Sequence, residues 1–245
     1  MNFKIDVKKK PSWLVIALRE ISSFFFSPVA YIVMALFLAI TGFLFFSTFF
    51  LYNQASMRSF FSLLPILFAF FVPAMTMRLF ADEKRTGTME VLLTLPVTGR
   101  DVVLGKFAGS VVSIAILLLP TLAYPITIAF VGDLDPGVIA GGYIGSLFLG
   151  SAFAAIGIFA SIQTDNQIIA FVTGFVICAA LVFINSFLVL LPAGLVKLFA
   201  YISAGAHFEN ISRGVLDSRD FIYFISLCAL FLLRTILVVD DRRNA

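Results

Sequence analysis

The sequence predicts an all-α integral membrane protein with six transmembrane helices, and three observations predict it. Of the 245 residues, 61% are hydrophobic and only 13% are charged, against roughly 25% charged in a soluble domain. A globule of this size could not hide so much apolar surface from water. Several charge-free runs are long enough to cross a hydrocarbon core, which needs about 20 helical residues. Lipid is therefore the expected solvent.

The segment before the first span is basic and then amphipathic. Residues 12–27 combine Trp13, Ile16 and Phe24 with the charged pair Arg19 and Glu20. This mixture predicts an amphipathic helix that lies in the cytoplasmic membrane interface. The alternative is a loose hydrophobic lead-in to the first span. No small-residue cleavage site follows, so we expect no cleaved signal peptide.

Six spans account for the charge-free runs, because backbone groups in lipid must bond within their own segment. We expect them at residues 29–51, 59–79, 103–131, 143–163, 168–191 and 221–239.

Prolines and small residues modify these spans. Prolines are expected to kink the second and third spans: Pro65, Pro73, Pro120 and Pro125. Small residues at helical spacing form a stripe on the third span and another on the fourth: Gly105, Gly109, Ser113; Ser146, Gly150, Ala154. Such stripes let helix backbones approach closely. Packing within the subunit explains them better than a dimer interface or a substrate path.

The distribution of cations sets the orientation. With the N-terminus in the cytoplasm, thirteen Lys and Arg residues lie on the cytoplasmic side and four on the other. This positive-inside bias predicts that both termini are cytoplasmic. The formal net charge of +3 is too small to indicate a nucleic-acid partner.

Between the last two spans, residues 192–220 are too polar for a span and too apolar for a simple loop. Two short helices with a break near Gly205 fit this pattern. They would form an external helical hairpin that lies on the outer surface or dips back into the membrane, where protein or water meets the broken backbone.

The sequence contains no recognisable catalytic, cofactor or metal site. The string from Gly99 to Phe107 imitates a phosphate-binding loop, but its glycines are one residue too far apart and Phe107 replaces the hydroxyl residue that would hold magnesium. Arg100 and Lys106 in this string read better as positive-inside anchors. His207 is the only histidine, and we expect a surface or packing role. The spans lack a series of acids or histidines that would indicate a proton relay.

The informative segment is the cytoplasmic loop 81–101, ADEKRTGTMEVLLTLPVTGRD. A charged cluster is followed by Gly87, by Thr88 as a helix cap, and by a short apolar helix over Met89 to Leu95 that Pro96 ends. An apolar helix held off the membrane by charged flanks favours docking into a protein groove. The alternative is that it lies flat on the bilayer.

This loop resembles the E-K-R-x-G-T-x-E-x-L-L-x-x-P pattern of ABC-2 type permeases, the membrane subunits of one class of ATP-binding-cassette exporter. Several longer strings are similar to the permease of gliding-motility-associated transporters: PAMTMRLFADEKRTGTMEVLLTLP, LLPTLAYPITI, IGIFASIQTDNQIIAF and HFENISRGVLDSRDFIYF. The resemblance runs from Pro28 to Val239. Asp82 is a small departure, since many relatives have glutamate there.

The resemblance implies a coupling element in this loop that docks a separate ATPase. Its residues would be Asp82, Glu83, Lys84, Arg85, Gly87, Thr88, Glu90, Leu92, Leu93 and Pro96. ATP and magnesium would be bound by the ATPase, and this chain would bind no cofactor. Family members also have the N-terminal interfacial helix and the external hairpin.

The function that the resemblance implies is that of the membrane-spanning permease subunit of an exporter in the bacterial inner membrane. Its partners would be ABC ATPase subunits and a second permease, identical or different, with periplasmic or auxiliary membrane proteins also possible. The alternative is a membrane anchor whose ATPase drives mechanical or maturation work, such as gliding or copper-enzyme assembly, instead of export.

Overall fold

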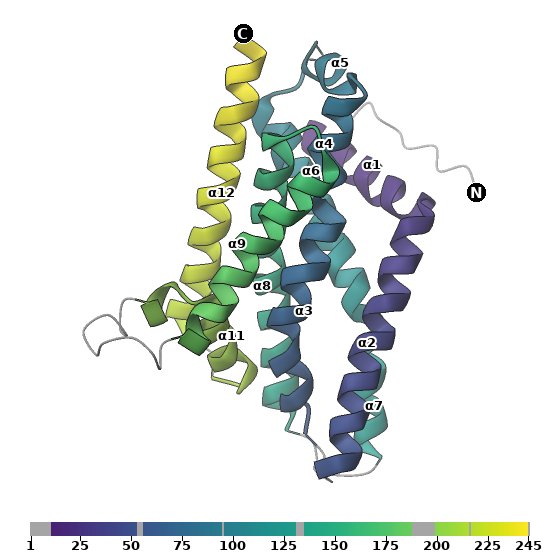
Figure 1. Ribbon diagram of the computed structural model, residues 1–245, viewed down its shortest axis with the longest axis vertical. Helices are drawn as coiled ribbons and strands as arrows, with labels where there is room; N and C mark the ends of the chain where they lie inside the picture. Colours follow the sequence, from purple (N-terminus) through teal and green to yellow (C-terminus); the bar gives the residue numbers. More distant parts are fainter. Residues whose placement is uncertain are drawn as a thin grey trace.

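Figure 1 shows a computed structural model in which residues 11–52, 56–94, 96–130, 135–187, 199–215 and 217–244 are described. Within these ranges the secondary structure is helical and contains no strand. Six helical segments are long and apolar enough to cross a membrane. The prediction of an all-α protein with six candidate spans is therefore confirmed.

The first helices form a corner. α1 (Ser12–Phe26) ends where Ser27 takes an extended backbone, with φ −87° and ψ 129°. α2 (Pro28–Tyr52) starts immediately afterwards, and its first residue is a proline, whose fixed φ suits a helix start. In Figure 1, α1 crosses the bundle at one end, and α2 runs from that corner toward the opposite end. The predicted N-terminal helix is thus present, and its place in the membrane interface stays a proposal.

The second candidate span extends beyond its predicted end, into the predicted cytoplasmic loop. α3 (Arg58–Thr76) stays helical through both of its internal prolines. A single non-helical residue, Met77, separates it from α4 (Arg78–Arg85). α5 (Thr88–Thr94) follows after Gly87, which has a φ of +70° that other residues rarely adopt. The first five residues of the predicted loop, 81–85, therefore belong to a helix that continues the span.

The third candidate span is broken where its prolines predict a kink. α6 (Gly99–Leu118) begins with a capping box in which the Thr98 side chain and Asp101 bond each other's backbone amides. A short 3-10 helix, η2 (Leu119–Leu122), contains Pro120 and leads into α7 (Ala123–Ala129). The predicted kink of this span is confirmed.

α8 (Pro136–Gln163) is the central helix, and it begins seven residues before the predicted span. It packs against α3, α6, α9, α11 and α12, and 72% of its candidate span is buried. Its glycines allow this packing: a Cβ added at Gly142 would lie 2.3 Å from Phe61, and one at Gly150 would lie 2.9 Å from Ile114. The small-residue stripe of this helix therefore serves packing within the subunit, as predicted.

The remaining elements are α9 (Gln167–Phe187), α11 (Ala204–Ser212) and α12 (Ser218–Asn244). The break predicted near Gly205 lies two residues earlier, at Ser203, whose hydroxyl accepts a hydrogen bond from the Ala206 amide and caps α11. Gly205 allows close packing, since a Cβ there would lie 3.1 Å from the Val182 carbonyl oxygen. The rest of the predicted hairpin, residues 192–198, lies outside the described residues.

The two ends of the bundle differ in what they carry. One end of the bundle carries α1, α4, α5 and the end of α12, and we call it the α5 end. The other end carries α7 and the end of α2 (Figure 1). The outer surfaces of α2, α9 and α12 stay open, with only 22%, 28% and 22% of their candidate spans buried. These surfaces suit contact with lipid or with a second subunit.

The arrangement makes a labelling prediction. Single cysteines at Thr94 on α5 and at Pro136 at the start of α8, in a background without Cys178 and Cys228, should react with a membrane-impermeant maleimide from opposite sides of the membrane. Thr94 is preferred to Gly87 because a cysteine at a φ of +70° would be strained. The Thr94 cysteine should react from the cytoplasm. Labelling of both cysteines from one side would refute the six-span topology.

Candidate functional site

At the α5 end, one buried lysine joins three helices. The Lys106 side chain on α6 is 1% exposed, and its Nζ lies 3.0 Å from Glu20 Oε1 on α1 and 2.9 Å from Glu83 Oε1 on α4. The ammonium also donates to the Leu79 carbonyl oxygen at 2.7 Å. We call Lys106, Glu20 and Glu83 the Lys106 cluster. Lys106, interpreted from the sequence as a positive-inside anchor, therefore has its charge neutralised inside the protein.

Two glycines explain how Glu20 reaches this lysine. A Cβ at Gly105 would lie 2.7 Å from the Trp13 carbonyl oxygen, and one at Gly109 would lie 2.9 Å from Glu20 Cβ. Only residues without a side chain let α1 approach α6 so closely. The small-residue stripe on α6 is therefore the surface on which α1 packs, and this is again packing within the subunit.

The break between α3 and α4 is held by a serine of the central helix. The Ser161 hydroxyl accepts hydrogen bonds from the amides of Phe80 and Ala81, both at 3.0 Å, and donates to the Met77 carbonyl oxygen at 2.7 Å. The backbone groups left unpaired by the break are thereby satisfied. Lys84 adds a 3.0 Å hydrogen bond to the Ile162 carbonyl oxygen. α4 is thus fastened to α8.

α5 turns part of its apolar surface toward the protein itself. Met89 and Leu92 are buried and pack in a cluster with Phe80 and Val102, whereas Glu90 is exposed and Val91 is 65% exposed. The side chain of Leu93 lies outside the described part of the chain. Leu92 therefore faces the protein's own core, because a helix of seven residues that packs on a neighbour must turn part of its apolar surface inward.

Thr88 does not cap α5 through its oxygen as predicted. Its hydroxyl instead donates to the Glu83 carbonyl oxygen at 3.4 Å and shares a 2.9 Å bond with the Thr86 hydroxyl. Pro96 is exposed beyond the end of α5. These contacts fold the Gly87 turn back onto α4.

A groove of about 480 Å³ runs beside α5, and we call it the α5 groove. Three segments far apart in the sequence form it: α5 with the preceding turn, the turn between α8 and α9, and the end of α12. Its lining residues are Lys84, Gly87, Met89, Glu90, Gln163, Thr164, Asp165 and Arg242. Asp82 lies in the same region. Its carboxylate pairs with Arg85 at 3.0 Å and accepts a hydrogen bond from the side-chain amide of Gln167.

The predicted coupling residues thus divide into two groups. Glu83 and Leu92 point into the protein, whereas Lys84, Gly87 and Glu90 line the α5 groove. Arg85 is exposed at the same end. What sequence reasoning missed is that the α8–α9 turn and the end of α12 share one surface with α5.

A second buried pair lies at the opposite end, and we call it the His207–Asp220 pair. His207 Nδ1 lies 2.6 Å from Asp220 Oδ1, and Nε2 donates to the Tyr201 carbonyl oxygen at 3.0 Å. The imidazole also stacks on Tyr223 with ring centroids 4.2 Å apart. Because a carbonyl only accepts, Nε2 carries a hydrogen, and a second hydrogen lies between Nδ1 and the carboxyl group. The packing role expected for His207 is thus more specific than the sequence predicted.

Comparison with family models identifies a family for most of the chain. A family model described as ABC-2 family transporter protein matches residues 46–239. The matched range begins within α2 and includes α4, α5, every lining residue of the α5 groove except Arg242, and most of α12, while α1 lies before it. A search of the curated proteins found no match.

Proposed function

The chain belongs to the ABC-2 family of transporter proteins, and from that premise we propose that it is the membrane-spanning permease subunit of an ABC exporter energised by a separate ATPase. The observation that carries the proposal is the family match across most of the chain, together with six candidate spans. ATP and magnesium would be held by the ATPase, and this chain would supply the passage through the membrane.

The α5 groove is the docking surface that we propose for the ATPase. It lies at the α5 end, and Glu90, which lines it, is followed on α5 by the exposed apolar side chain of Val91. Because Val91 is exposed, burying it against a partner would remove apolar surface from water, which is the main favourable term in association. Charged residues around it, including Lys84, Asp165 and Arg242, would fix orientation and partner choice.

The contacts of α4 supply a route from this surface to the spans. A displacement of α5 would move α4, which is bonded to α8 through Ser161 and to α1 and α6 through the Lys106 cluster. Short polar contacts therefore link α4, which follows α5 when α5 moves, to α1, α6 and α8. We propose that they transmit the movement of the ATPase as one unit.

We further propose that two permease subunits pair, with a route between them lined in part by α3 and α9. The low burial of α2 and α9 is consistent with a covering partner or lipid. The site of action would be the bacterial inner membrane, with both termini in the cytoplasm. The narrower likeness to gliding-motility-associated permeases rests on the Thr164–Gln167 and Ser212–Asp220 strings and stays a proposal.

Replacing Val91 with aspartate should weaken recovery of the ATPase by about tenfold, because full burial of a valine contributes roughly 1.5–3 kcal/mol. The measurement is the amount of ATPase that co-purifies with the tagged permease from detergent extract, normalised to permease abundance. Glu90→Lys should act in the same direction but less strongly, since a rim charge mainly changes association rate.

Val215→Asp is the matched control. Val215 is 61% exposed, close to the 65% of Val91, and it follows α11 at the opposite end of the bundle. It should leave ATPase recovery unchanged. Equal recovery with Val91→Asp and wild type would move the docking surface away from α5. Leu92→Asp is unsuitable for this test, because Leu92 is buried and its replacement would damage the fold.

A further inference from the structure

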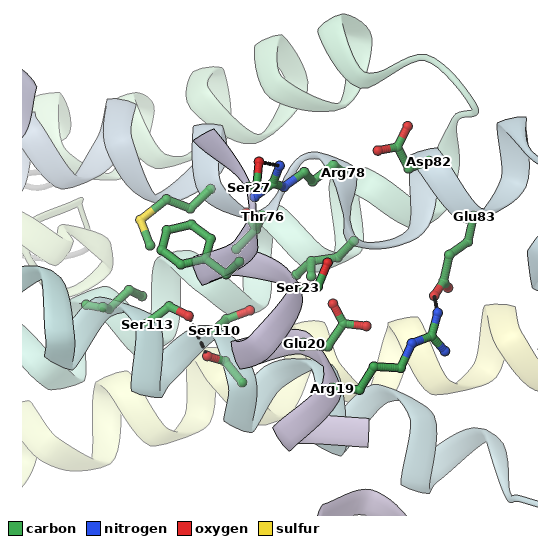
Figure 2. A pocket seen from close by; sticks show the side chains of 15 residues that line it. Arg19, Glu20, Ser23, Ser27, Thr76, Arg78, Asp82, Glu83, Ser110 and Ser113 are labelled. Carbon is green, nitrogen blue, oxygen red and sulfur yellow. Dashed lines mark hydrogen bonds and ion pairs between the residues drawn. The ribbon is translucent and has the colours of Figure 1, made fainter. Parts of the chain in front are cut away.

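A cavity of about 350 Å³ lies between α1, the α3–α4 junction and α6 (Figure 2). It extends from the Arg19–Glu83 contact toward Ile114, which is about two helical turns further along α6 than Lys106. Its charged side chains come from α1 and α4, α6 supplies hydroxyls, and apolar surface comes from Phe24, Met75 and Ile114.

Arg78 is the distinctive residue of this cavity. Its guanidinium donates to the Ser27 hydroxyl at 3.0 Å and lies 5.8 Å from the centroid of the Phe24 ring, as Figure 2 shows for the Ser27 bond. Within the described ranges no carboxylate lies within 4.0 Å of it. The other arginines described are exposed to solvent, whereas Arg78 is half-buried.

The neighbouring carboxylates are already neutralised. Glu20 and Glu83 pair with Lys106, Glu83 also faces Arg19, and Asp82 pairs with Arg85. Counting this network with Arg78 gives four cations against three carboxylates, which leaves one positive charge in excess. That excess belongs to Arg78, since each of the other cations has a carboxylate partner.

A half-buried cation without a counter-ion is costly, so the cavity is built for an anion. A guanidinium has five N–H donors in a planar fork that fits two oxygens of one phosphate, and only one donor is used by Ser27. The hydroxyls of Ser23 on α1 and of Ser27, just after the end of α1, also line the cavity. The apolar side chains of the lining would not be stabilised by contact with a free inorganic ion. They would be stabilised by contact with the carbon chain of an amphiphile.

We propose that this cavity binds the phosphate of a membrane phospholipid. Arg78 would hold the phosphate, assisted by the Ser23 and Ser27 hydroxyls, and the glycerol and first acyl carbons would lie along Phe24, Met75 and Ile114. A bound lipid would wedge the corner between α1 and α2 at the level where the chain enters the membrane. The proposal does not depend on export or on an ATPase, since it concerns this chain alone.

The test is native mass spectrometry of the purified full-length chain titrated with dioleoyl phosphatidylglycerol. Arg78→Gln should weaken binding of the first lipid by about tenfold, the effect of losing a charge-assisted hydrogen bond. Arg78→Lys should lose less, because it keeps the charge but not the fork. Arg100→Gln, which removes the same charge from an exposed residue at the same end, should bind the lipid as wild type does.

Two further probes identify the anion's source. Dioleoylglycerol, which has the same acyl chains and no phosphate, should bind the wild type at least about tenfold more weakly than the phospholipid. Inorganic phosphate should neither bind comparably nor displace it. Wild-type affinity in Arg78→Gln, or equal affinity for dioleoylglycerol, would overturn the proposal, and comparable binding of inorganic phosphate would overturn the lipid assignment. If Arg78→Gln does not fold, the comparison of the phospholipid with dioleoylglycerol on the wild type decides whether the phosphate is recognised.

Discussion

Replacing Lys106 with methionine should destabilise the folded protein by about 3–5 kcal/mol, the usual effect of removing one partner from a buried ion pair. Methionine fills a similar volume but leaves Glu20 without a cation partner, and leaves Glu83 with only the exposed Arg19 at 4.0 Å. Both carboxylates are mostly buried, with side chains 15% and 13% exposed, so water cannot replace the ammonium fully. The Leu79 carbonyl oxygen would lose its donor as well.

The measurement is the free energy of unfolding in mixed detergent micelles, with the thermal midpoint as a second readout. Lys84→Met is the matched control, because Lys84 donates to a carbonyl oxygen and, within the described ranges, has no carboxylate within 4.0 Å of its ammonium. Its loss should cost no more than about 1.5 kcal/mol. Adding Glu20→Gln and Glu83→Gln to Lys106→Met should restore much of the lost stability. A Lys106→Met protein as stable as Lys84→Met would show that the cluster is not a structural tie.

The parts of the fold that depend on composition and local spacing could be predicted from the sequence. Charge-free runs marked the six candidate spans because lipid excludes unpaired backbone groups. The glycines on α6 and α8 were correctly assigned to close packing, because a missing side chain is visible without knowing its partner. The broken third span followed from Pro120, since proline removes a helical hydrogen bond wherever it lies.

Contacts between distant segments could not be predicted in this way. Lys106 and Glu20 are 86 residues apart, and nothing in either local sequence marks them as partners. In the sequence Lys106 looks like other cations near a span end. Only the approach of α1 to Gly105 and Gly109 makes it a buried residue.

The inward face of α5 was unpredictable for a different reason. A helix of seven residues has fewer than two full turns, so its apolar pattern cannot establish which side faces the protein. Met89 and Leu92 are three residues apart and lie on one face, while Val91 lies on another. The conformation of the Gly87 turn decides between these faces, and that conformation is set by Thr86 and Thr88 bonding back to α4.

His207→Leu should be nearly as damaging as the Lys106 substitution, and its effect should be centred on the opposite end of the molecule. Leucine has a similar volume, but Asp220, which is 3% exposed, would lose its partner. Its second oxygen, Oδ2, already lacks a hydrogen bond in the described structure, so both carboxylate oxygens would be unpaired. The expected loss is about 3–5 kcal/mol, and the Tyr201 carbonyl oxygen would lose its donor too.

An exposed ion pair on the same helix provides the control. Arg213 and Glu209 form an i, i+4 pair on α11 whose side chains are 59% and 49% exposed. Such pairs contribute about 0.3–0.5 kcal/mol, so Arg213→Leu should be almost neutral. Hydrogen exchange should show faster exchange of the α11 amides in His207→Leu but not in Arg213→Leu. The double variant His207→Leu with Asp220→Leu should regain stability, since replacing both partners of a buried pair with apolar residues is often neutral. If His207→Leu and Arg213→Leu are equally mild, the His207–Asp220 pair does not hold α11 against the start of α12.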